Sequence, residues 1–505
     1  MSAKPAVPAP TLEELRVAAG QLHYNLNDRE LTMYGGFMGG LVSDINLVDT
    51  LDAPTLPVKY PRGELIRPRG TDNPYNAWYW KCTIKGAPGG KLKGKRVVIK
   101  DNISVASVPM MNGSAVYADF VPDQDATVVT RVLDAGGVIL GKAVCENYCF
   151  SGGSHTAATG PVRNPRNPDF MTGGSSSGCA ALLVAGECDL AIGSDQGGSV
   201  RMPSSFSGCV GLKPSYGLVP YTGATPIEQT VDHLGPMATN TADCALLLEV
   251  IAGYDDGRDP RQTALLAPKN YLSELDKGIK GLRIGVLQEG FGGPGAEEDV
   301  DAMVRDAAIR LQGAGAIVAH VSVPVHRQAA SIMMASVLDG TLSTFTELGP
   351  NGPNPKGHSL VEAIRYYYKA QRERADDMPV TVKTVLLCAR IMRNRYGNYY
   401  SAKAQNLVRT VRAAYDAVFA DHDLLLMPTT PMKAHLIPPP AATLAEILGC
   451  ALDMLGNTAP FDATGHPSMS VPAGMSEGLP VGLMLTGRYG EDDIVLRAGH
   501  AFERL

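Results

Sequence analysis

The sequence predicts a mixed α/β fold in which a central β-sheet is covered by helices. A short β-rich run at residues 96–99 is followed by an amphipathic helical stretch at 126–136 and a second β-rich run at 138–142. The same strand–helix–strand order recurs at residues 282–286, 300–311 and 316–323, and further strand patterns stand at 423–428 and 468–474. Strands that alternate with helical patterns are typical of α/β folds.

The N-terminal part, residues 1–72, is predicted to be a separate helical segment. Thr11 followed by Glu14 forms a capping-box pattern, which marks the start of a helix. A proline-rich stretch at residues 54–61 then interrupts the helical pattern. The remaining residues, 73–505, are assigned to one large domain.

Within that domain, residues from about 330 to 405 are predicted to form a helical insertion. This stretch is rich in arginine, lysine and tyrosine, a combination that also occurs at nucleic-acid interfaces. We interpret it instead as a solvated helical cap, because arginine stems cover apolar surface and the whole chain carries a net charge of −6.

Composition limits the classes of function. Apolar residues make up 45% of the 505 residues and charged residues 19%, as in a globular protein with a large core. The negative charge gives no attraction to nucleic acid or anionic membranes, and no apolar run is long enough to span a bilayer, so neither partner is expected. The oligomeric state is left open, with a homodimer among the options.

Cysteine and histidine usage indicates a cytoplasmic protein without a metal. The nine cysteines are scattered and odd in number, which favours reduced buried thiols. No histidine stands at a ligand-like spacing from a cysteine pair, so a zinc site is not expected. The N-terminal residues contain no apolar segment typical of a secretory signal.

Two Gly/Ser-rich loops, residues 173–178 and 193–201, stand out from the rest of the sequence. Glycines let backbone N–H groups crowd around a small anion, and serine hydroxyls can act as nucleophile or proton relay. The first loop also fits G-x-S-x-G, but a nucleophile elbow needs a strand directly before it, and a proline-rich loop stands there. A G-x-G-x-x-G pattern at 290–295 lacks the acidic residue that dinucleotide binding requires and is interpreted as a turn.

A hydrolase built on these serines needs a base, because a serine hydroxyl attacks an amide only when its proton is removed. His233 and His466 are the only histidines beside Gly/Pro loops, and neither has an evident role. Lys100 ends the predicted strand at 96–99. Burial favours the neutral form of a lysine amine, which can accept a proton. Lys100 is therefore the candidate base.

Taken together, these segments resemble the amidase signature family. The resemblance covers the chain from about residue 73 to its end and rests on residues 97–102, 160–165, 173–178, 193–217, 457–467 and 478–484. Within the family, the chain looks most like stand-alone bacterial amidases that accompany nitrile hydratases, which also carry a helical N-terminal extension. The resemblance implies the amidase signature fold.

The resemblance also implies the roles of individual residues. Ser199 matches the nucleophile, and Lys100 matches the base. Ser175 matches the relay serine, whose preceding peptide bond is cis in the family. Ser194 stands where the family often has threonine, which keeps the hydroxyl. In the family, backbone N–H groups form the oxyanion hole, and the groups that match them here are those of Gln196, Gly197, Gly198 and Ser199.

The expected activity is hydrolysis of small amides through an acyl-enzyme, without metal or cofactor. Carbamates present the same carbonyl and are included. Phe150 and the apolar stretch at 447–455 favour an apolar pocket for aliphatic or aromatic amides. The alternative is the A subunit of a glutamine-dependent tRNA amidotransferase, which usually carries arginines where Leu218 and Tyr221 stand here. A non-catalytic relative is disfavoured because Lys100 and both serines are present.

Overall fold

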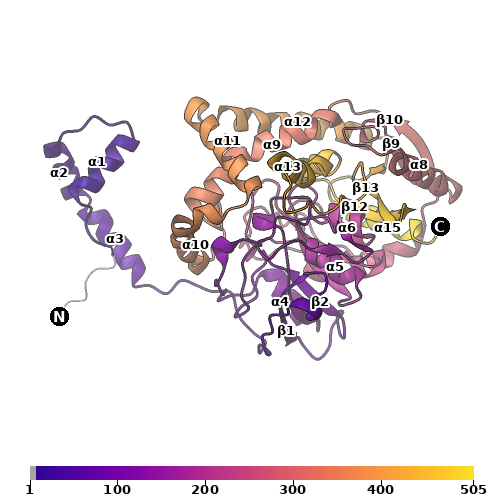
Figure 1. Ribbon diagram of the computed structural model, residues 1–505, viewed down its shortest axis with the longest axis horizontal. Coiled ribbons are helices and arrows are strands. Elements are labelled where there is room, and N and C mark those ends of the chain that lie inside the picture. The colour runs from indigo at the N-terminus through magenta and orange to yellow at the C-terminus, as the bar shows by residue number, and fades with distance from the viewer. Residues whose placement is uncertain (1–6) are drawn as a thin grey trace. The chain divides into compact units, whose positions relative to one another are not determined.

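The structure of the protein is a computed structural model that describes residues 7–505. The chain divides into two compact units, one up to Leu56 and one from Pro57 to Leu505. The first unit contains three helices within its described residues, coloured indigo in Figure 1: α1 (Leu12–Gln21), α2 (Asp28–Phe37) and α3 (Gly39–Asp49). The sequence-based domain division at residue 72 stays a prediction.

The capping box predicted at the first helix is confirmed. The Glu14 backbone N–H donates to Thr11 Oγ1 at 3.3 Å, and the Thr11 N–H donates to Glu14 Oε2 at 2.7 Å. Leu15, Ala19 and Leu31 form a small apolar cluster that joins α1 to α2. Helices α1 and α2 are therefore held by capping and by a core of only a few residues.

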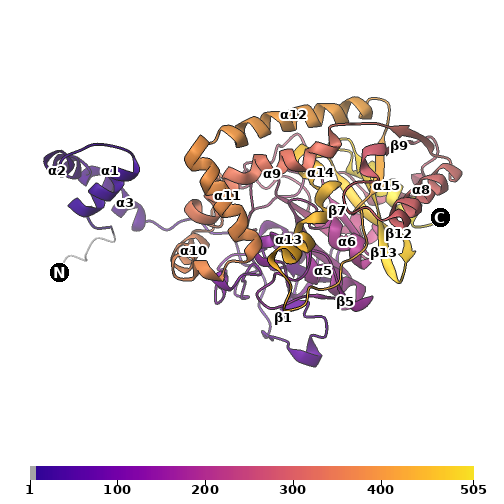
Figure 2. The ribbon, with the colours of Figure 1, turned by 45° about the horizontal axis from the view of Figure 1, so that its top comes forward.

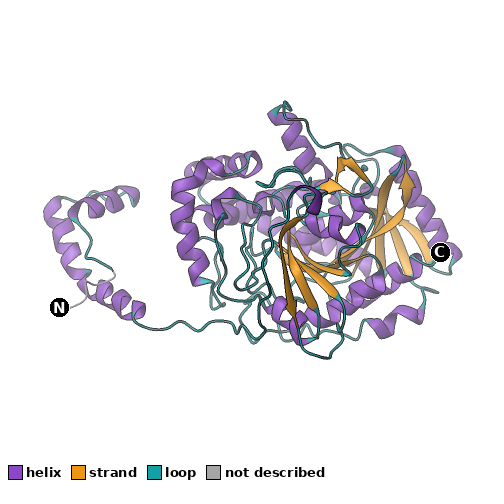
Figure 3. Cartoon of the chain, turned by 60° about the horizontal axis from the view of Figure 1, so that its bottom comes forward, coloured by secondary structure: helices purple, strands orange, loops and turns teal. Residues whose placement is uncertain are grey.

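The second unit is built on a large mixed sheet, drawn in orange in Figure 3. Among the described residues, the sheet has 11 strands in the order β1-β3-β2-β6-β8-β7-β12-β13-β11-β9-β10. Their bounds are β1 (Trp78–Lys85), β2 (Arg96–Lys100), β3 (Val138–Ala143), β6 (Leu190–Asp195), β7 (Val210–Lys213), β8 (His233–Ala238), β9 (Arg283–Leu287), β10 (Ile317–Val321), β11 (Leu424–Pro428), β12 (Ser468–Ser476) and β13 (Leu479–Gly487). A separate hairpin pairs β4 (Arg163–Asn164) with β5 (Asn167–Met171).

Both parallel and antiparallel pairs occur in the sheet. Strand β2 runs parallel to β3 on one side and to β6 on the other. Strand β6 pairs with β8 in antiparallel register, and antiparallel pairing continues through β7, β12, β13 and β11. The pairs β11–β9 and β9–β10 are parallel again. The predicted mixed α/β fold is therefore confirmed.

Helices surround the sheet (Figure 3). The helices outside the cap are α4 (Thr127–Asp134), α5 (Ser177–Val184), α6 (Arg201–Ser207), α7 (Thr241–Ile251), α8 (Glu298–Gly313), α13 (Leu444–Leu452), α14 (Ala459–Thr464) and α15 (Asp492–Phe502). Apolar side chains of the central strands and of most of these helices are buried against each other in two large clusters, which is the main source of stability in such a layered fold. Within the described residues, no helix is both long enough and apolar enough to cross a membrane.

Four helices follow one another between the sheet strands β10 and β11: α9 (His326–Ser343), α10 (Val361–Arg374), α11 (Val380–Tyr396) and α12 (Tyr399–Phe419). Helices α9 and α12 lie side by side (Figures 1 and 2). Arginines of α11 pair with acidic residues: Arg393 with Asp339 at 2.6 Å and with Glu347 at 2.7 Å. The segment is thus helical and Arg393 pairs within it, while its role as a solvated cap stays a prediction.

Candidate active site

Lys100 lies at the end of β2, in the interior of the sheet, and is completely buried. Its Nζ donates hydrogen bonds to Ser175 Oγ at 2.7 Å, to Ser194 Oγ at 2.8 Å and to the Ser194 carbonyl oxygen at 3.2 Å. Strand β2 runs parallel to β6, so the C-terminal ends of both strands lie at the same edge of the sheet. Lys100 is the last residue of β2 and β6 ends at Asp195, so Lys100 and the second Gly/Ser loop lie at that edge.

The first Gly/Ser loop holds Ser175 in a tightly packed turn. The Gly174–Ser175 peptide bond is cis, as the resemblance implied. A Cβ atom on Gly174 would lie 2.1 Å from the Gly153 carbonyl oxygen, so only glycine fits at that position. The Ser175 carbonyl oxygen accepts a hydrogen bond from the Glu146 N–H at 3.1 Å. The serine hydroxyl is thereby turned toward Lys100 with no exposure to solvent.

The second Gly/Ser loop, residues 193–201, brings Ser199 next to the first. The Ser176 N–H donates to the Ser199 carbonyl oxygen at 3.1 Å, which joins the two loops directly. The carboxylate of Asp195 accepts from the backbone N–H groups of Gly198 at 2.6 Å and Val200 at 3.0 Å. This carboxylate therefore fixes the loop on both sides of Ser199.

Arg201 anchors the same loop from behind. Its guanidinium is completely buried and donates to both oxygens of Asp195, at 3.0 and 2.9 Å, and to Asp462 Oδ2 at 2.6 Å. Burial disfavours the charged form of Asp195, but the charge and hydrogen bonds of Arg201 outweigh it and hold the pKa of that carboxyl well below its usual range. Burial and the neighbouring Asp195 charge raise the pKa of Asp462 well above its usual range.

One of the four backbone N–H groups that were predicted to form the oxyanion hole is already paired. Within the described residues, the N–H groups of Gln196, Gly197 and Ser199 have no hydrogen-bond partner. The N–H group of Gly198 already donates to Asp195 Oδ1. Glycine is required at position 198 because its φ is +132° and because a Cβ atom there would lie 2.3 Å from Thr458 Oγ1.

Ser199 faces a pocket whose walls are mostly apolar. Predicted Phe150 lines this pocket, and from the predicted stretch at 447–455 it is Leu452 and Leu455 that contribute. The pocket holds about 470 Å³ of empty space, part of it open to solvent, and its further apolar lining comes from Met202, Ile227, Val231, Met333, Met334 and Val337.

The two histidines considered from the sequence have other partners. His233 lies 2.7 Å from the Val231 carbonyl oxygen and 3.3 Å from Lys213 Nζ. His466 lies 3.0 Å from Asp416 Oδ1. Burial lowers the pKa of both imidazoles. Both histidines are therefore buried and make polar contacts within the core.

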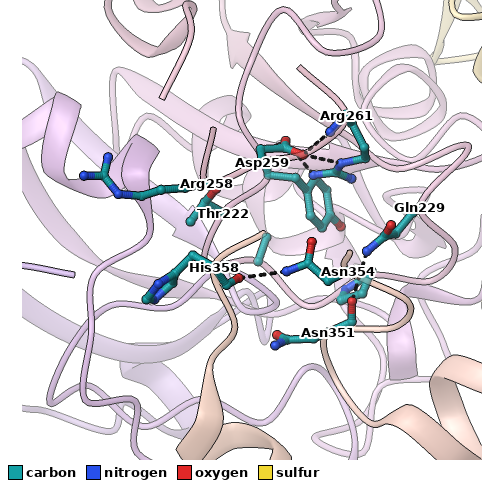
Figure 4. A pocket seen from close by; sticks show the side chains of 12 residues that line it. Thr222, Gln229, Arg258, Asp259, Arg261, Asn351, Asn354 and His358 are labelled. Atoms are coloured by element: carbon teal, nitrogen blue, oxygen red, sulfur yellow. Dashed lines mark hydrogen bonds and ion pairs between the residues drawn. The ribbon is translucent and has the colours of Figure 1, made fainter. Parts of the chain in front are cut away.

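Tyr221 is a neighbour of the site that the sequence analysis did not assign. Its hydroxyl accepts a hydrogen bond from Gln196 Nε2 at 2.7 Å, while its backbone N–H donates to Asp259 Oδ2 at 2.8 Å. Tyr221 also lines a polar pocket, shown in Figure 4, in which Asp259 is paired with Arg261 at 2.7 Å. The Arg261 guanidinium lies 4.5 Å from the centre of the Tyr221 ring. These contacts hold Tyr221, and through it the Gln196 side chain, in place.

The fold and this geometry define an α/β enzyme with a buried lysine–serine pair beside two Gly/Ser loops. The sequence profile of the family described as Amidase matches residues 76–496. The chain therefore belongs to the amidase family and is an enzyme that hydrolyses amides.

Individual relatives agree with this assignment. An enantioselective amidase from Rhodococcus rhodochrous is 44% identical over 439 residues, covering 86% of this chain and 84% of the relative. The A subunit of a glutamyl-tRNA(Gln) amidotransferase from Methanosarcina mazei is 36% identical, covering 82% of this chain and 85% of the relative. The crystal structure of a bacterial aryl acylamidase of the amidase signature family superposes with a TM-score of 0.70 at 27% identity, covering 83% of each chain.

Proposed function

We propose that this amidase works through a Ser–Ser–Lys triad in which Ser199 is the nucleophile, Ser175 the proton relay and Lys100 the base. The observation that carries the proposal is the 2.7 Å hydrogen bond between Lys100 Nζ and Ser175 Oγ in a site closed to solvent. The proposed role requires that Lys100 Nζ accept the proton of Ser175 when Ser199 attacks. The hydrogen bond from the Ser176 N–H to the Ser199 carbonyl oxygen joins the two loops that carry Ser175 and Ser199.

The reaction we propose is acyl transfer in two halves. Lys100 takes the proton of Ser175 while Ser175 takes that of Ser199, and Ser199 Oγ forms a bond to the carbonyl carbon. The relay then returns the proton to the leaving nitrogen as the C–N bond breaks. Water attacks the acyl-enzyme in the second half and releases the acid.

We assign the oxyanion hole to the N–H groups of Gln196, Gly197 and Ser199. Donors that are already in place and unpaired stabilise the charge that develops on the carbonyl oxygen, with about 3–4 kcal/mol lost when one such donor is removed. Gly198 takes no part as a donor in this proposal because Asp195 occupies its N–H.

The substrate class we propose is small amides with an aliphatic or aromatic acyl group, with carbamates as a second class. The support is the apolar lining next to Ser199, which includes Phe150, Met333 and Leu455. The alternative activity on glutamine as part of a tRNA amidotransferase finds less support, because the identity to the amidotransferase relative is 36% against 44% to the amidase.

The test of the nucleophile is Ser199→Ala, which removes only the attacking atom. We expect no measurable turnover of acetamide, benzamide or an ethyl carbamate, while the circular dichroism spectrum and melting temperature stay as in the wild type. Ser205→Ala, in the following helix, is the matched control and should keep most of the activity. Intact-protein mass spectrometry with an ester substrate should show an acyl adduct on the wild type that Ser199→Ala lacks. An active Ser199→Ala would refute the triad.

We also propose that the purified chain acts without a partner protein and forms a homodimer in the cytoplasm. Large apolar side chains of the N-terminal unit, among them Phe37, Leu41 and Val48, lie outside its own small core and supply surface that a second copy would cover. Light scattering on the full chain tests the homodimer: a mass of 53.4 kDa at micromolar concentration would contradict it.

A further inference from the structure

One wall of the apolar pocket beside Ser199 comes from the helical insertion. Met333, Met334 and Val337 of α9 line this pocket, and their spacing places Met333 and Val337 on the same face of the helix. Both of these side chains are buried. The segment that we interpreted from the sequence as a solvated cap therefore also contributes to the pocket.

The same wall continues with Leu455 and reaches the loop of residues 193–201 at Gly197. Leu455 belongs to the short helical turn η8 (Asp453–Gly456), which contacts α9. A Cβ atom placed on Gly197 would lie 3.7 Å from Met333 Cε and 3.4 Å from Leu455 Cδ2, and both are ordinary van der Waals distances. The ends of these two side chains therefore lie against the part of the loop to which we assign an oxyanion donor.

Hydrogen bonds hold this wall in place relative to the loop. Thr458 Oγ1 donates to the Gly197 carbonyl oxygen at 2.6 Å. The Asn457 side chain donates to the Pro428 carbonyl oxygen at 2.8 Å, and its Oδ1 lies 3.1 Å from Nε2 of His326, the first residue of α9. The residues that follow η8 are therefore tied both to α9 and to Gly197.

The position of this wall relates it to one carbon atom of the substrate. In the proposed reaction, the carbonyl carbon bonds to Ser199 Oγ and the carbonyl oxygen accepts a hydrogen bond from the Gly197 N–H. The α-carbon of the acyl group is one bond from that carbonyl carbon, so it lies beside Gly197, where Met333 and Leu455 end. A substituent on the α-carbon therefore presses on these two side chains. This step rests on the proposed function, which supplies the position of the carbonyl group.

We propose that Met333 and Leu455 determine how many substituents the α-carbon of the acyl group can carry, so that aliphatic amides with an unbranched α-carbon are the favoured substrates. Val337 lies about one helical turn after Met333 and limits the length of the acyl chain instead. A methionine side chain is flexible and yields to a small extra group. The loss of activity with each added substituent is therefore graded rather than abrupt.

The experiment measures kcat/KM of the full-length protein for acetamide, propanamide, 2-methylpropanamide and 2,2-dimethylpropanamide, a series that adds one methyl group at a time to the α-carbon. In the wild type we expect kcat/KM to fall from propanamide onward. Met333→Ala and Leu455→Ala should each raise the value for 2,2-dimethylpropanamide relative to propanamide by about tenfold over the wild type, because one carbon in an apolar pocket is worth about that factor. Met333→Leu conserves the volume of the side chain but lacks the terminal methyl group, and should change this ratio in the same direction without loss of the fold.

Val337→Ala is the matched control, because it shortens another buried side chain of the same wall. It should leave the ratio of 2,2-dimethylpropanamide to propanamide as in the wild type and raise kcat/KM for hexanamide relative to propanamide. The proposal is overturned if Met333→Ala, Met333→Leu and Leu455→Ala all keep the wild-type ratio, or if Val337→Ala changes it as much as they do. Either outcome leaves the triad standing as long as Ser199→Ala is inactive, whereas an active Ser199→Ala refutes the triad whatever these ratios are.

Discussion

Replacement of Arg201 by methionine probes the support of the nucleophile loop, because within the described residues no other side chain forms an ion pair with Asp195. Arg201 makes two hydrogen bonds to Asp195, one to Asp462 and one to the Thr458 carbonyl oxygen at 2.9 Å, all without solvent. Methionine fills a similar volume but cannot form any of these hydrogen bonds. Removing one partner of a buried ion pair typically costs about 3–5 kcal/mol, because the remaining charge is buried alone.

The pH dependence of the variant follows from the same contacts. In the wild type the pKa of Asp195 is lowered by Arg201, so its contribution to stability is present above the unfolded value of about 3.9 and is lost as pH falls below it. In Arg201→Met, only the hydrogen bonds from groups such as the Gly198 and Val200 N–H still oppose burial, and we expect burial to prevail and to raise the pKa of Asp195 above the unfolded value. The effect of this carboxyl on the free energy of unfolding then has the opposite sign. Below about pH 3.9 it does not destabilise the folded state, and as pH rises above that value it destabilises the folded state increasingly.

The assay is differential scanning calorimetry of wild type and Arg201→Met between pH 5 and pH 8. We expect a melting temperature that is lower by several degrees in the variant, with a larger deficit at pH 8 than at pH 5. The double variant Arg201→Met/Asp195→Asn removes the unpaired charge and should recover part of the loss. An equal deficit at both pH values, or a double variant less stable than the single one, would refute this account of the loop.

Two further substitutions test the triad and the oxyanion loop. Lys100→Arg keeps the positive charge, but guanidinium does not give up its proton, so we expect a folded protein with kcat lower by about 10³-fold, measured by steady-state hydrolysis of a simple amide. Near-normal turnover would remove Lys100 from the role of base. Gly198→Ala places a Cβ 2.3 Å from Thr458 Oγ1 and should lower kcat by about 100-fold. Gly186→Ala, also at a positive φ but with open space around it, is the control for backbone strain alone and should keep its activity.

Features that lie in short sequence segments could be predicted. The strands at β2, β3, β9 and β11 appear as local runs of β-branched and aliphatic residues, and the two Gly/Ser loops stand out by composition. Strands β7 and β8 were missed because Gly211, Gly235 and Pro236 interrupt the apolar pattern there. Both strands are completely buried, so packing between neighbouring strands outweighs the weak local propensity.

Contacts between distant segments could not be predicted in the same way. Asp462 meets Arg201 across 261 residues, and Tyr221 meets Gln196 only because two loops cross beside the sheet. Neither residue carries a local signal, since a single aspartate or tyrosine is ordinary in any loop. Likewise, four consecutive N–H groups look equivalent in sequence, and only the position of the Asp195 carboxylate separates Gly198 from the other three.

The loop of residues 193–201 therefore combines a buried anchor and unpaired backbone donors within nine residues. Asp195 and Arg201 face the interior, where charge and hydrogen bonds fix the backbone, while Gln196, Gly197 and Ser199 keep their N–H groups unpaired beside an apolar pocket. Unpaired donors are costly in a folded protein unless rigid surroundings keep the backbone from turning to satisfy them. The buried ion pair supplies that rigidity. It follows that substitutions at the anchor should reduce activity and stability together, whereas Ser199→Ala should reduce activity alone.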